Sequence, residues 1–176
     1  IERLDGFWPR TRKEYRYKMR LLVFGSGDFA PTVIALAKDC GHEPVGLVDD
    51  FNQGGEILGS LEDAMRSHPP SSHGIVLAIG YKDLLARWRA WGRLRAAGYA
   101  APALIHPRAY VADTASLGAG CMVMAGAIVD VRAEVAEATV LWPSACINHD
   151  TRIGSNCFIS PNATVCGFAN VGANSF

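Results

Sequence analysis

The 176-residue chain lacks several features that would assign it to a common class of protein. It has no net charge, with 17 Lys and Arg against 17 Asp and Glu, so electrostatics gives no reason to expect nucleic acid or an anionic membrane as a partner. It has no run of about 18 apolar residues, and we therefore expect no membrane span. Its amino terminus has no signal-peptide pattern, which predicts a cytoplasmic protein.

The chain also lacks paired cysteines and clustered metal ligands. Its five cysteines include no CxxC pair, so the sequence predicts neither a disulfide framework nor a zinc knuckle. Only His106 and His149 fall in the carboxy-terminal part, too few for a hydratase zinc site with three histidine ligands. We expect no bound metal.

Residues 1–18 differ from the rest of the chain. They carry six Lys and Arg against three Asp and Glu and no methionine, whereas Met19 opens a well-patterned strand. We interpret residues 1–18 as an extension or the tail of an upstream region, and place the first domain at residues 19–104.

Residues 105–176 carry a strict six-residue repeat. Every sixth residue is Ile, Leu or Val, and the residue four places after each is small. Three hexads, each a short strand and a corner, close one triangular coil of about 18 residues. The pattern predicts an all-β, left-handed parallel β-helix of four coils, with Cys121 and Cys157 two coils apart and too distant for a disulfide. The predicted interior residues are Ile105, Val111, Leu117, Val123, Val129, Val135, Leu141, Ile147, Ile153, Ile159, Val165 and Val171.

Residues 19–104 alternate strand and helix patterns, which predicts a Rossmann-like α/β unit with a parallel sheet. Apolar runs predict strands at 20–24, 44–50 and 74–80. Helices are expected from the turn after the first strand to about residue 40, near 60–67 and over 82–97. In the last helix, Leu84, Trp88 and Trp91 are expected to share one face.

A glycine-rich turn with the pattern G-x-G-x-x-A follows the first strand. Backbone N–H groups at a helix amino terminus can hold a phosphate, and an acidic pair 24 residues after the first glycine suits a ribose. The alternative, that the glycines only tighten the turn, stays open, and the turn alone is weak evidence for a nicotinamide cofactor or an oxidoreductase. The predicted substrate-binding residues are Gly25, Ser26, Gly27, Asp28, Phe29, Asp49, Asp50 and Gly80.

At this point the sequence resembles the hexapeptide-repeat nucleotide-sugar acetyltransferases of bacterial glycan synthesis, which N-acetylate UDP-4-amino sugars or O-acetylate sialic acid. The resemblance covers residues 19–176. It rests on the glycine-rich turn with its acidic pair, the segment Ile105-His106-Pro107, the hexads, and Asn148-His149-Asp150 followed by Ile153-Gly154. It implies a homotrimer, with acetyl-CoA along the β-helix between subunits and the nucleotide sugar held by the first domain.

The resemblance also implies catalytic roles. His149 falls in a corner of the repeat, where the family has a general base that acts on the sugar amine or hydroxyl. Asp150 is the acidic neighbour that orients or polarises the imidazole. Gly167, one coil above His149, offers its N–H to the thioester carbonyl as an oxyanion donor and cofactor contact.

Three departures from the family pattern qualify these roles. Phe29 stands where the family usually has a histidine, and Asp28 replaces a common glycine. Phe158 replaces a second histidine, which weakens the cofactor contact predicted there. Relatives continue through more than four coils, so we expect either a truncated chain or weaker binding of the acyl donor. The alternative is a non-catalytic trimeric scaffold, or a sugar-nucleotide-binding protein with impaired CoA binding.

Overall fold

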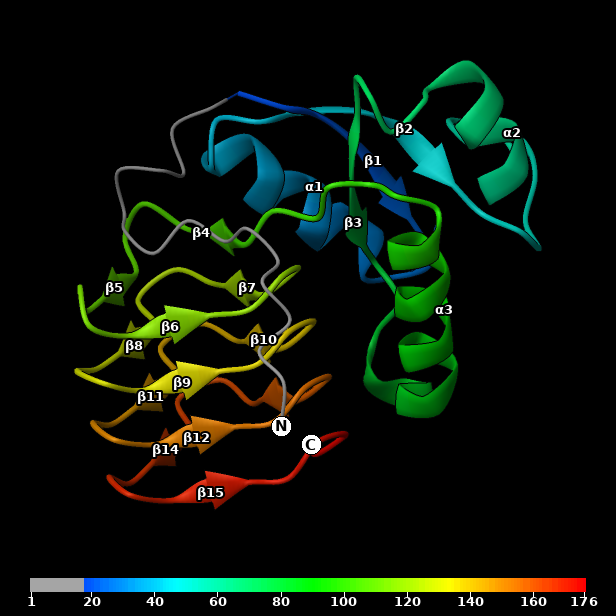
Figure 1. Ribbon diagram of the computed structural model, residues 1–176. Helices are drawn as coiled ribbons and strands as arrows, with labels where there is room; N and C mark the ends of the chain where they lie inside the picture. Colours follow the sequence, from blue (N-terminus) through cyan, green and yellow to red (C-terminus); the bar gives the residue numbers. More distant parts are fainter. Residues whose placement is uncertain (1–17) are drawn as a thin grey trace.

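The computed structural model describes residues 18–176, so residues 1–17 of the predicted extension lie outside the described residues. A Rossmann-like α/β part is followed by a left-handed parallel β-helix, as the sequence predicted (Figure 1). The α/β part has a parallel three-stranded sheet in the order β2-β1-β3. Its elements are β1 (Arg20–Phe24), α1 (Ala30–Asp39), β2 (Glu43–Val48), α2 (Leu61–Ser67), β3 (Gly74–Leu77), the 3-10 turn η2 (Tyr81–Asp83) and α3 (Leu84–Ala96).

Two strands end earlier than the sequence predicted. β2 stops at Val48 because the carboxylate of Asp49 accepts hydrogen bonds from the backbone N–H groups of Phe51 and Asn52, which turns the chain out of the sheet. β3 stops at Leu77, although the N–H of Ala78 still donates to the carbonyl of Phe24. The acidic pair and Gly80 therefore lie in loops beyond the sheet.

The predicted face of α3 packs against the core, and an arginine shares it. Its buried residues are Arg87, Ala90, Trp91 and Leu94, whereas Leu84 and Trp88 are only half-buried. Arg87 is fully buried because backbone carbonyls of the loop after β3 and of the β-helix accept its hydrogen bonds. The helical period places Arg87, three residues after Leu84, on this same face, but the sequence pattern gave no reason to expect a buried arginine there.

The β-helix consists of twelve two-residue strands, and the second residue of each is the predicted interior aliphatic residue. They form three parallel sheets of four strands. The first sheet is β4 (Leu104–Ile105), β7 (Met122–Val123), β10 (Val140–Leu141) and β13 (Phe158–Ile159). The second sheet is β5 (Tyr110–Val111), β8 (Ile128–Val129), β11 (Cys146–Ile147) and β14 (Thr164–Val165). The third sheet is β6 (Ser116–Leu117), β9 (Glu134–Val135), β12 (Arg152–Ile153) and β15 (Asn170–Val171).

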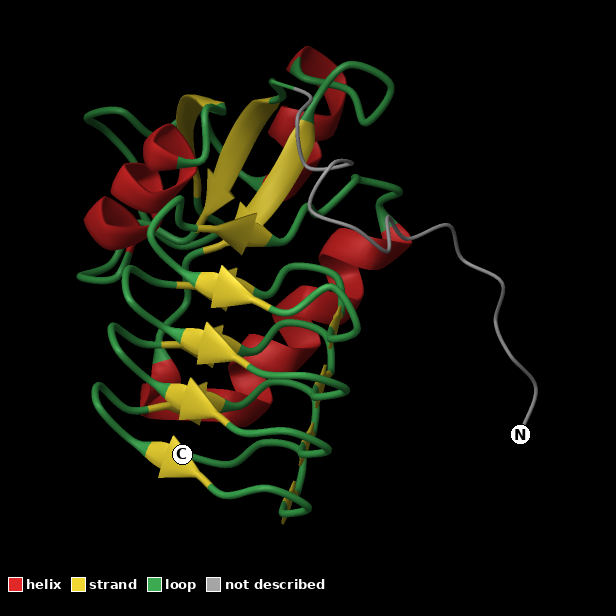
Figure 2. Cartoon of the chain, turned by 90° about the vertical axis from the view of Figure 1, so that its left-hand side faces the viewer, coloured by secondary structure: helices red, strands yellow, loops and turns green. Residues whose placement is uncertain are grey.

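Strands of successive coils lie one above another in unbroken register (Figure 2). Of the twelve aliphatic residues, the seven from Val123 to Ile159 are buried. The other five pack against the same core but are only partly buried, because they lie in the first and last coils, where one neighbouring coil is missing on one side. Cys121 and Cys157 are buried free thiols, as expected.

The corners of the coils impose an unusual backbone conformation. The residue three places after the interior aliphatic has a positive φ in ten corners, and in eight of them it is not glycine. Asn tolerates this left-handed conformation at little cost, but Arg132 and Phe168 adopt it with φ of 56° and 62° against the steric preference of a large side chain. The coil geometry, rather than the residue type, therefore sets the conformation.

The α/β part packs against one side of the β-helix. Outward residues of the first sheet, including Val140 and Phe158, share a core with Phe29 and Val33 of the turn and α1. α3 covers the corner between the third and first sheets, where Trp91 Nε1 donates to Glu137. This leaves the corner between the second and third sheets on the opposite side, at the left of Figure 1, and we call it the His149 corner.

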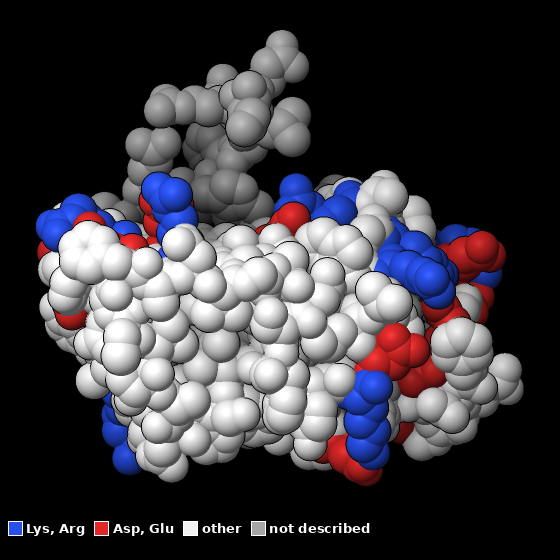
Figure 3. Space-filling view, turned by 90° about the horizontal axis from the view of Figure 1, so that it is seen from below, with Lys and Arg blue, Asp and Glu red and all other residues white. Residues whose placement is uncertain are grey.

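Seen from below, the last coil forms a broad, mostly uncharged surface with charged side chains around its margin (Figure 3). Val165 and Val171 of this coil are partly exposed, whereas equivalent residues one coil earlier are buried. In residues 18–176 no helix is long and apolar enough to cross a membrane.

Candidate active site

His149 lies in the corner that joins β11 to β12, as the repeat predicted. Its side chain is 45% exposed, and its Nδ1 atom lies 2.9 Å from Oδ2 of Asp150. The ring is therefore anchored on one nitrogen while a substantial part of it faces solvent. Histidine is the side chain that most often acts as a general acid or base, and this position suits that role.

A third residue, Arg132, completes a network at the His149 corner. It lies at the position equivalent to Asp150 in the preceding coil and donates from Nε to Oδ1 of Asp150 at 2.7 Å and from Nη2 to Oδ2 at 2.8 Å. These bonds, together with His149, lower the pKa of Asp150 to about 2. Arg132 was not predicted as a site residue, although its spacing of 18 residues from Asp150 is the coil period.

Gly167 lies against the imidazole, in the coil that follows the coil of His149, as predicted. A Cβ atom built on Gly167 would lie 2.8 Å from Cε1 and 2.9 Å from Nε2 of His149, closer than real Cβ contacts allow. The φ of Gly167 is not positive, so glycine is needed here for space rather than for backbone freedom. An oxyanion role for its N–H stays a prediction.

Phe168 forms another side of the His149 corner. Its side chain is 71% exposed, and its ring meets the His149 ring edge-on, with centroids 5.2 Å apart. The N–H of Phe168 donates to the carbonyl of His149 at 3.2 Å, which ties the two coils together. Phe168 was not predicted as a site residue, although it too is one coil period from Asp150.

The close approach of Gly167 to the imidazole can be tested with two matched variants. Gly167→Ala is expected to displace the ring and lower turnover by roughly 10–100-fold, because small misplacements of a reacting group are costly. Gly172→Ala, in the same coil, places its Cβ in open space and should leave turnover unchanged. Steady-state rates of the two variants, with melting curves to show that both fold, make the comparison. Equal rates would show that the contact with His149 does not matter.

The predicted nucleotide site lies at the turn between β1 and α1. Gly25 has a φ of 110°, and a Cβ there would meet the backbone of Ala78 at 3.0 Å, so this position requires glycine. The turn leads into α1, whose first turn contains a proline and no acidic residue. This helix amino terminus can therefore accept an anion.

Asp49 joins the glycine-rich turn to the loop after β2. Its Oδ2 accepts hydrogen bonds from the N–H of Ser26 at 3.0 Å and from the Ser26 hydroxyl at 2.6 Å. Burial by itself would raise the pKa of Asp49, but bonds from Ser26, Asn52 and Phe51 outweigh it and hold this pKa well below its usual range. The predicted residues Ser26 and Asp49 are thus brought together, with Asp49 engaged in internal hydrogen bonds.

The lowered pKa of Asp49 predicts a pH-dependent effect on stability. A carboxyl group whose pKa is depressed by folding stabilises the protein above its unfolded pKa, near 4, and loses that contribution as pH falls through the folded value. Asp49→Asn should therefore lower Tm by roughly 2–4 °C at pH 7, the shift expected for about 1 kcal/mol from partly solvated hydrogen bonds. The difference from the wild type should shrink steadily below pH 4. A difference that is constant from pH 7 to pH 2 would contradict this assignment.

The other predicted substrate residues take separate positions. Asp50 accepts a hydrogen bond from the N–H of Leu61 at 3.0 Å and pairs with Arg93, so it connects β2 to α2 and α3. Gly80 precedes η2, and a Cβ there would lie 3.9 Å from Cβ of Phe29. Gly80 therefore lies beside the turn. Contacts of Asp50 and Gly80 with a substrate stay predictions.

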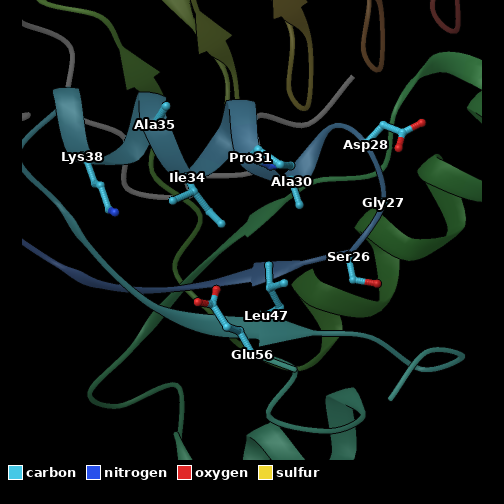
Figure 4. Close-up of a pocket in the computed structure, with 10 residues that line it drawn as sticks. All are labelled: Ser26, Gly27, Asp28, Ala30, Pro31, Ile34, Ala35, Lys38, Leu47 and Glu56. Carbon is cyan, nitrogen blue, oxygen red and sulfur yellow. The ribbon is translucent and has the colours of Figure 1, made fainter. Parts of the chain in front are cut away.

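A groove of about 630 Å³ extends from the glycine-rich turn along α1 (Figure 4). Ser26, Gly27 and Asp28 form one end of it. Ile34 and Lys38 point from α1 toward β2, from which Leu47 points back. The remaining lining residues are Ala30, Pro31, Ala35 and Glu56, none of which the sequence singled out. The groove therefore offers an apolar floor with charged residues at its margins.

Phe29 and Phe158 belong to an aromatic cluster between the two parts of the chain. Their ring centroids are 6.0 Å apart, and Trp142 lies 5.6 Å from Phe29. Phe158 is only 1% exposed and packs beneath the guanidinium of Arg87. Its side chain is thus part of the core, and a contact between this residue and a cofactor stays a prediction.

The two predicted sites lie on opposite sides of the chain. The glycine-rich turn packs on the first sheet, whereas the His149 corner is the vertex of the triangular coil that faces away from that sheet (Figure 1). One chain therefore does not bring its own nucleotide site to its own His149. Within residues 18–176 there is no group of three or more His, Cys, Asp or Glu side chains that could hold a metal ion.

Comparisons with known proteins cover both the α/β part and the β-helix. Residues 20–90 match the PglD N-terminal domain. A GDP-perosamine N-acetyltransferase from Caulobacter crescentus, solved with CoA and GDP-perosamine, is similar over 86% of this chain and 73% of its own, with 24% identity and a TM-score of 0.77. The acetyltransferase domain of PglB from Neisseria gonorrhoeae, solved with acetyl coenzyme A, is 26% identical over 89% of this chain and 86% of its own, with a TM-score of 0.66.

A third solved structure, WeeI from Acinetobacter baumannii, is 16% identical over 89% of this chain and 90% of its own, with a TM-score of 0.56, and shows the shared fold alone. All three likenesses span most of the residues that carry the α/β part and the coils. The chain therefore joins a PglD N-terminal domain to a hexapeptide β-helix, and its predicted resemblance to the hexapeptide-repeat sugar acetyltransferases is confirmed.

Proposed function

We propose that this chain is an acetyl-CoA-dependent sugar acetyltransferase of bacterial glycan biosynthesis, which acylates the amine or hydroxyl of a nucleotide-linked sugar. The observation that carries the proposal is the geometry of the His149 corner. Asp150 holds the imidazole at one nitrogen, and Gly167, which has no Cβ atom, leaves room for the ring. The likeness to an acetyltransferase domain solved with acetyl coenzyme A and to an enzyme solved with CoA and GDP-perosamine supports the substrate classes.

His149 is the proposed general base. It takes the proton of the acceptor amine or hydroxyl as that atom attacks the acyl carbonyl, and it later gives the proton to the departing sulfur. Coenzyme A supplies the acyl group as a thioester. The N–H of Gly167 is the proposed donor to the negatively charged oxygen that forms when the acceptor atom adds to the carbonyl carbon. The carbon–oxygen double bond is restored as the carbon–sulfur bond breaks, so the acetyl group stays on the sugar and coenzyme A leaves as its thiol.

The glycine-rich turn is the proposed holder of the sugar nucleotide. Its helix amino terminus suits the pyrophosphate, and the adjoining groove offers apolar and charged contacts along α1. Because the turn and His149 lie on opposite sides of one chain, a neighbouring copy must bring its nucleotide site to this corner. The proposed active site is therefore shared between subunits.

We expect the protein to form a homotrimer, since closed three-fold packing gives each His149 corner one neighbouring chain. The outward side of the second sheet, next to this corner, exposes apolar residues, with Tyr110 54% and Ile128 40% accessible. Light scattering at micromolar concentration should give three times the chain mass. A monomer at that concentration would contradict the shared site.

The experiment that tests the function offers acetyl-CoA together with a panel of UDP-, GDP-, dTDP- and CMP-linked amino sugars. The acetylated sugar should be detected by mass spectrometry, because the five free thiols, including the exposed Cys166, would react with thiol reagents. Calorimetric titration of acetyl-CoA separates the alternatives. Sugar-nucleotide binding without acetyl-CoA binding would instead indicate a binding protein with an impaired donor site, and binding of neither would indicate a trimeric scaffold.

A further inference from the structure

We propose that Arg132 is a positioning residue for His149: through Asp150 it fixes the imidazole with the proton on Nδ1, so that Nε2 carries the lone pair that accepts the substrate proton. This inference rests on the proposed role of His149 as general base. It adds a residue, from a different coil, that nothing in the repeat pattern or the resemblance assigns.

The hydrogen bonds connect Arg132 to Asp150 and Asp150 to His149. Both carboxylate oxygens of Asp150 accept a hydrogen bond from Arg132, at 2.7 and 2.8 Å. Oδ2 also lies 2.9 Å from Nδ1 of His149. A two-point contact between a planar guanidinium and a carboxylate fixes the plane of the carboxylate as well as its distance. The direction from which Oδ2 meets the imidazole is therefore set by Arg132.

The charge on Asp150 decides which nitrogen of His149 holds the proton. An aspartate is ionised in the whole physiological range, and the hydrogen bonds from Arg132 and His149 lower the pKa of Asp150 further, to about 2, so its carboxylate can only accept hydrogen bonds. The neutral imidazole then has to donate from Nδ1. Nε2, on the other side of the ring, is left as the acceptor, and it lies next to Gly167.

The backbone explains why these two side chains meet. Arg132 and Asp150 are one coil apart, at equivalent corner positions, with φ of 56° and 57°. Their coils are joined by the N–H of Asp150, which donates to the carbonyl of Val131 at 3.1 Å. The N–H of Arg132 itself donates to the Thr114 hydroxyl at 3.2 Å. The pair therefore stands on a backbone scaffold rather than on two independent loops.

A plain surface ion pair is the competing interpretation, because the Arg132 side chain is 64% exposed. Such a pair contributes little to folding, and its loss would leave turnover unchanged. Turnover and the state of the imidazole therefore discriminate between the two interpretations, whereas stability does not.

The kinetic test uses the full chain with the sugar identified by the panel. Arg132→Met should lower kcat by roughly 10-fold with little change in KM, and Arg132→Lys should recover part of the loss, because one donor replaces two. The double variant R132M/D150N should be no slower than D150N alone, since the two residues act in series. Arg66→Met removes another exposed Arg–Asp pair, on α2 (Figure 1), and should keep wild-type kcat.

The imidazole itself provides the second readout. Nitrogen-15 NMR of labelled His149 should show the Nδ1–H form in the wild type and a mixture of both tautomers in Arg132→Met. Wild-type kcat together with an unchanged tautomer in Arg132→Met would overturn the inference. This result differs from a failure of the proposed function, in which His149→Ala itself keeps its turnover whatever the tautomer.

Discussion

Replacing His149 with alanine is expected to lower turnover by roughly 10²–10⁴-fold, the usual contribution of a general base. The imidazole is the proposed base of the His149 corner, because the Asp150 carboxylate, ionised at neutral pH, is already engaged by Arg132 and His149. Sugar-nucleotide affinity should change little, since the proposed nucleotide contacts come from the glycine-rich turn rather than from this corner. Steady-state kinetics combined with calorimetric titration of the sugar nucleotide measures both quantities.

Asp150→Asn tests how much the neighbouring carboxylate contributes to turnover. An amide keeps the shape of the side chain but loses the charge that pairs with Arg132, so the imidazole remains present and is less well oriented. Its loss of turnover should therefore be smaller than that of His149→Ala. If His149→Ala keeps wild-type turnover with the cognate sugar, His149 is a corner residue without a catalytic role and the mechanism is wrong.

The β-helix could be predicted in detail because its pattern is repeated twelve times. A two-residue strand has little intrinsic preference, yet Ile147 and Ile153 are fixed by the coils on either side of them. The strand–helix alternation of the α/β part was also readable. β2 ends earlier than predicted because the carboxylate of Asp49 bonds to backbone N–H groups two and three residues on. The burial of Arg87 in α3 depends on a backbone carbonyl of the β-helix that is distant in sequence. Periodicity reports neither kind of contact.

The candidate site was predictable only in part. His149 and Gly167 could be placed because the period of 18 residues stacks them. Arg132 and Phe168 are stacked by the same period, but residue type gave no reason to select them from a column of corner residues. The contact between Arg132 and Asp150 depends on two side-chain conformations, and these became visible only with the coordinates.

Arg87 joins the two parts of the chain and is expected to be the position most sensitive to substitution. Its Nε donates to the carbonyl of Ile79 at 2.9 Å, and its Nη1 donates to the carbonyl of Ala138 at 2.6 Å and to the side chain of Asn156. Its guanidinium also lies 4.8 Å from the ring centroid of Phe158. Burial lowers its pKa to about 10, so the group remains charged at neutral pH.

Arg87→Met should destabilise the fold by roughly 3 kcal/mol and lower Tm by about 10 °C. Each buried acceptor left without a donor costs about 1–3 kcal/mol, and the removal of a desolvated cation offsets part of that sum. The wild type and the variant should be compared by chemical denaturation followed by circular dichroism.

Arg89→Met is the matched control for Arg87→Met, because Arg89 is an exposed arginine on the same helix. Substitutions at such surface positions change stability by no more than about 0.5 kcal/mol. A large loss at Arg87 with no loss at Arg89 would show that the hydrogen bonds across the junction, rather than the charge of α3, hold the α/β part against the coils. Equal stability of both variants would mean that the apolar contacts of Trp91 and Phe29 are sufficient to hold the two parts together.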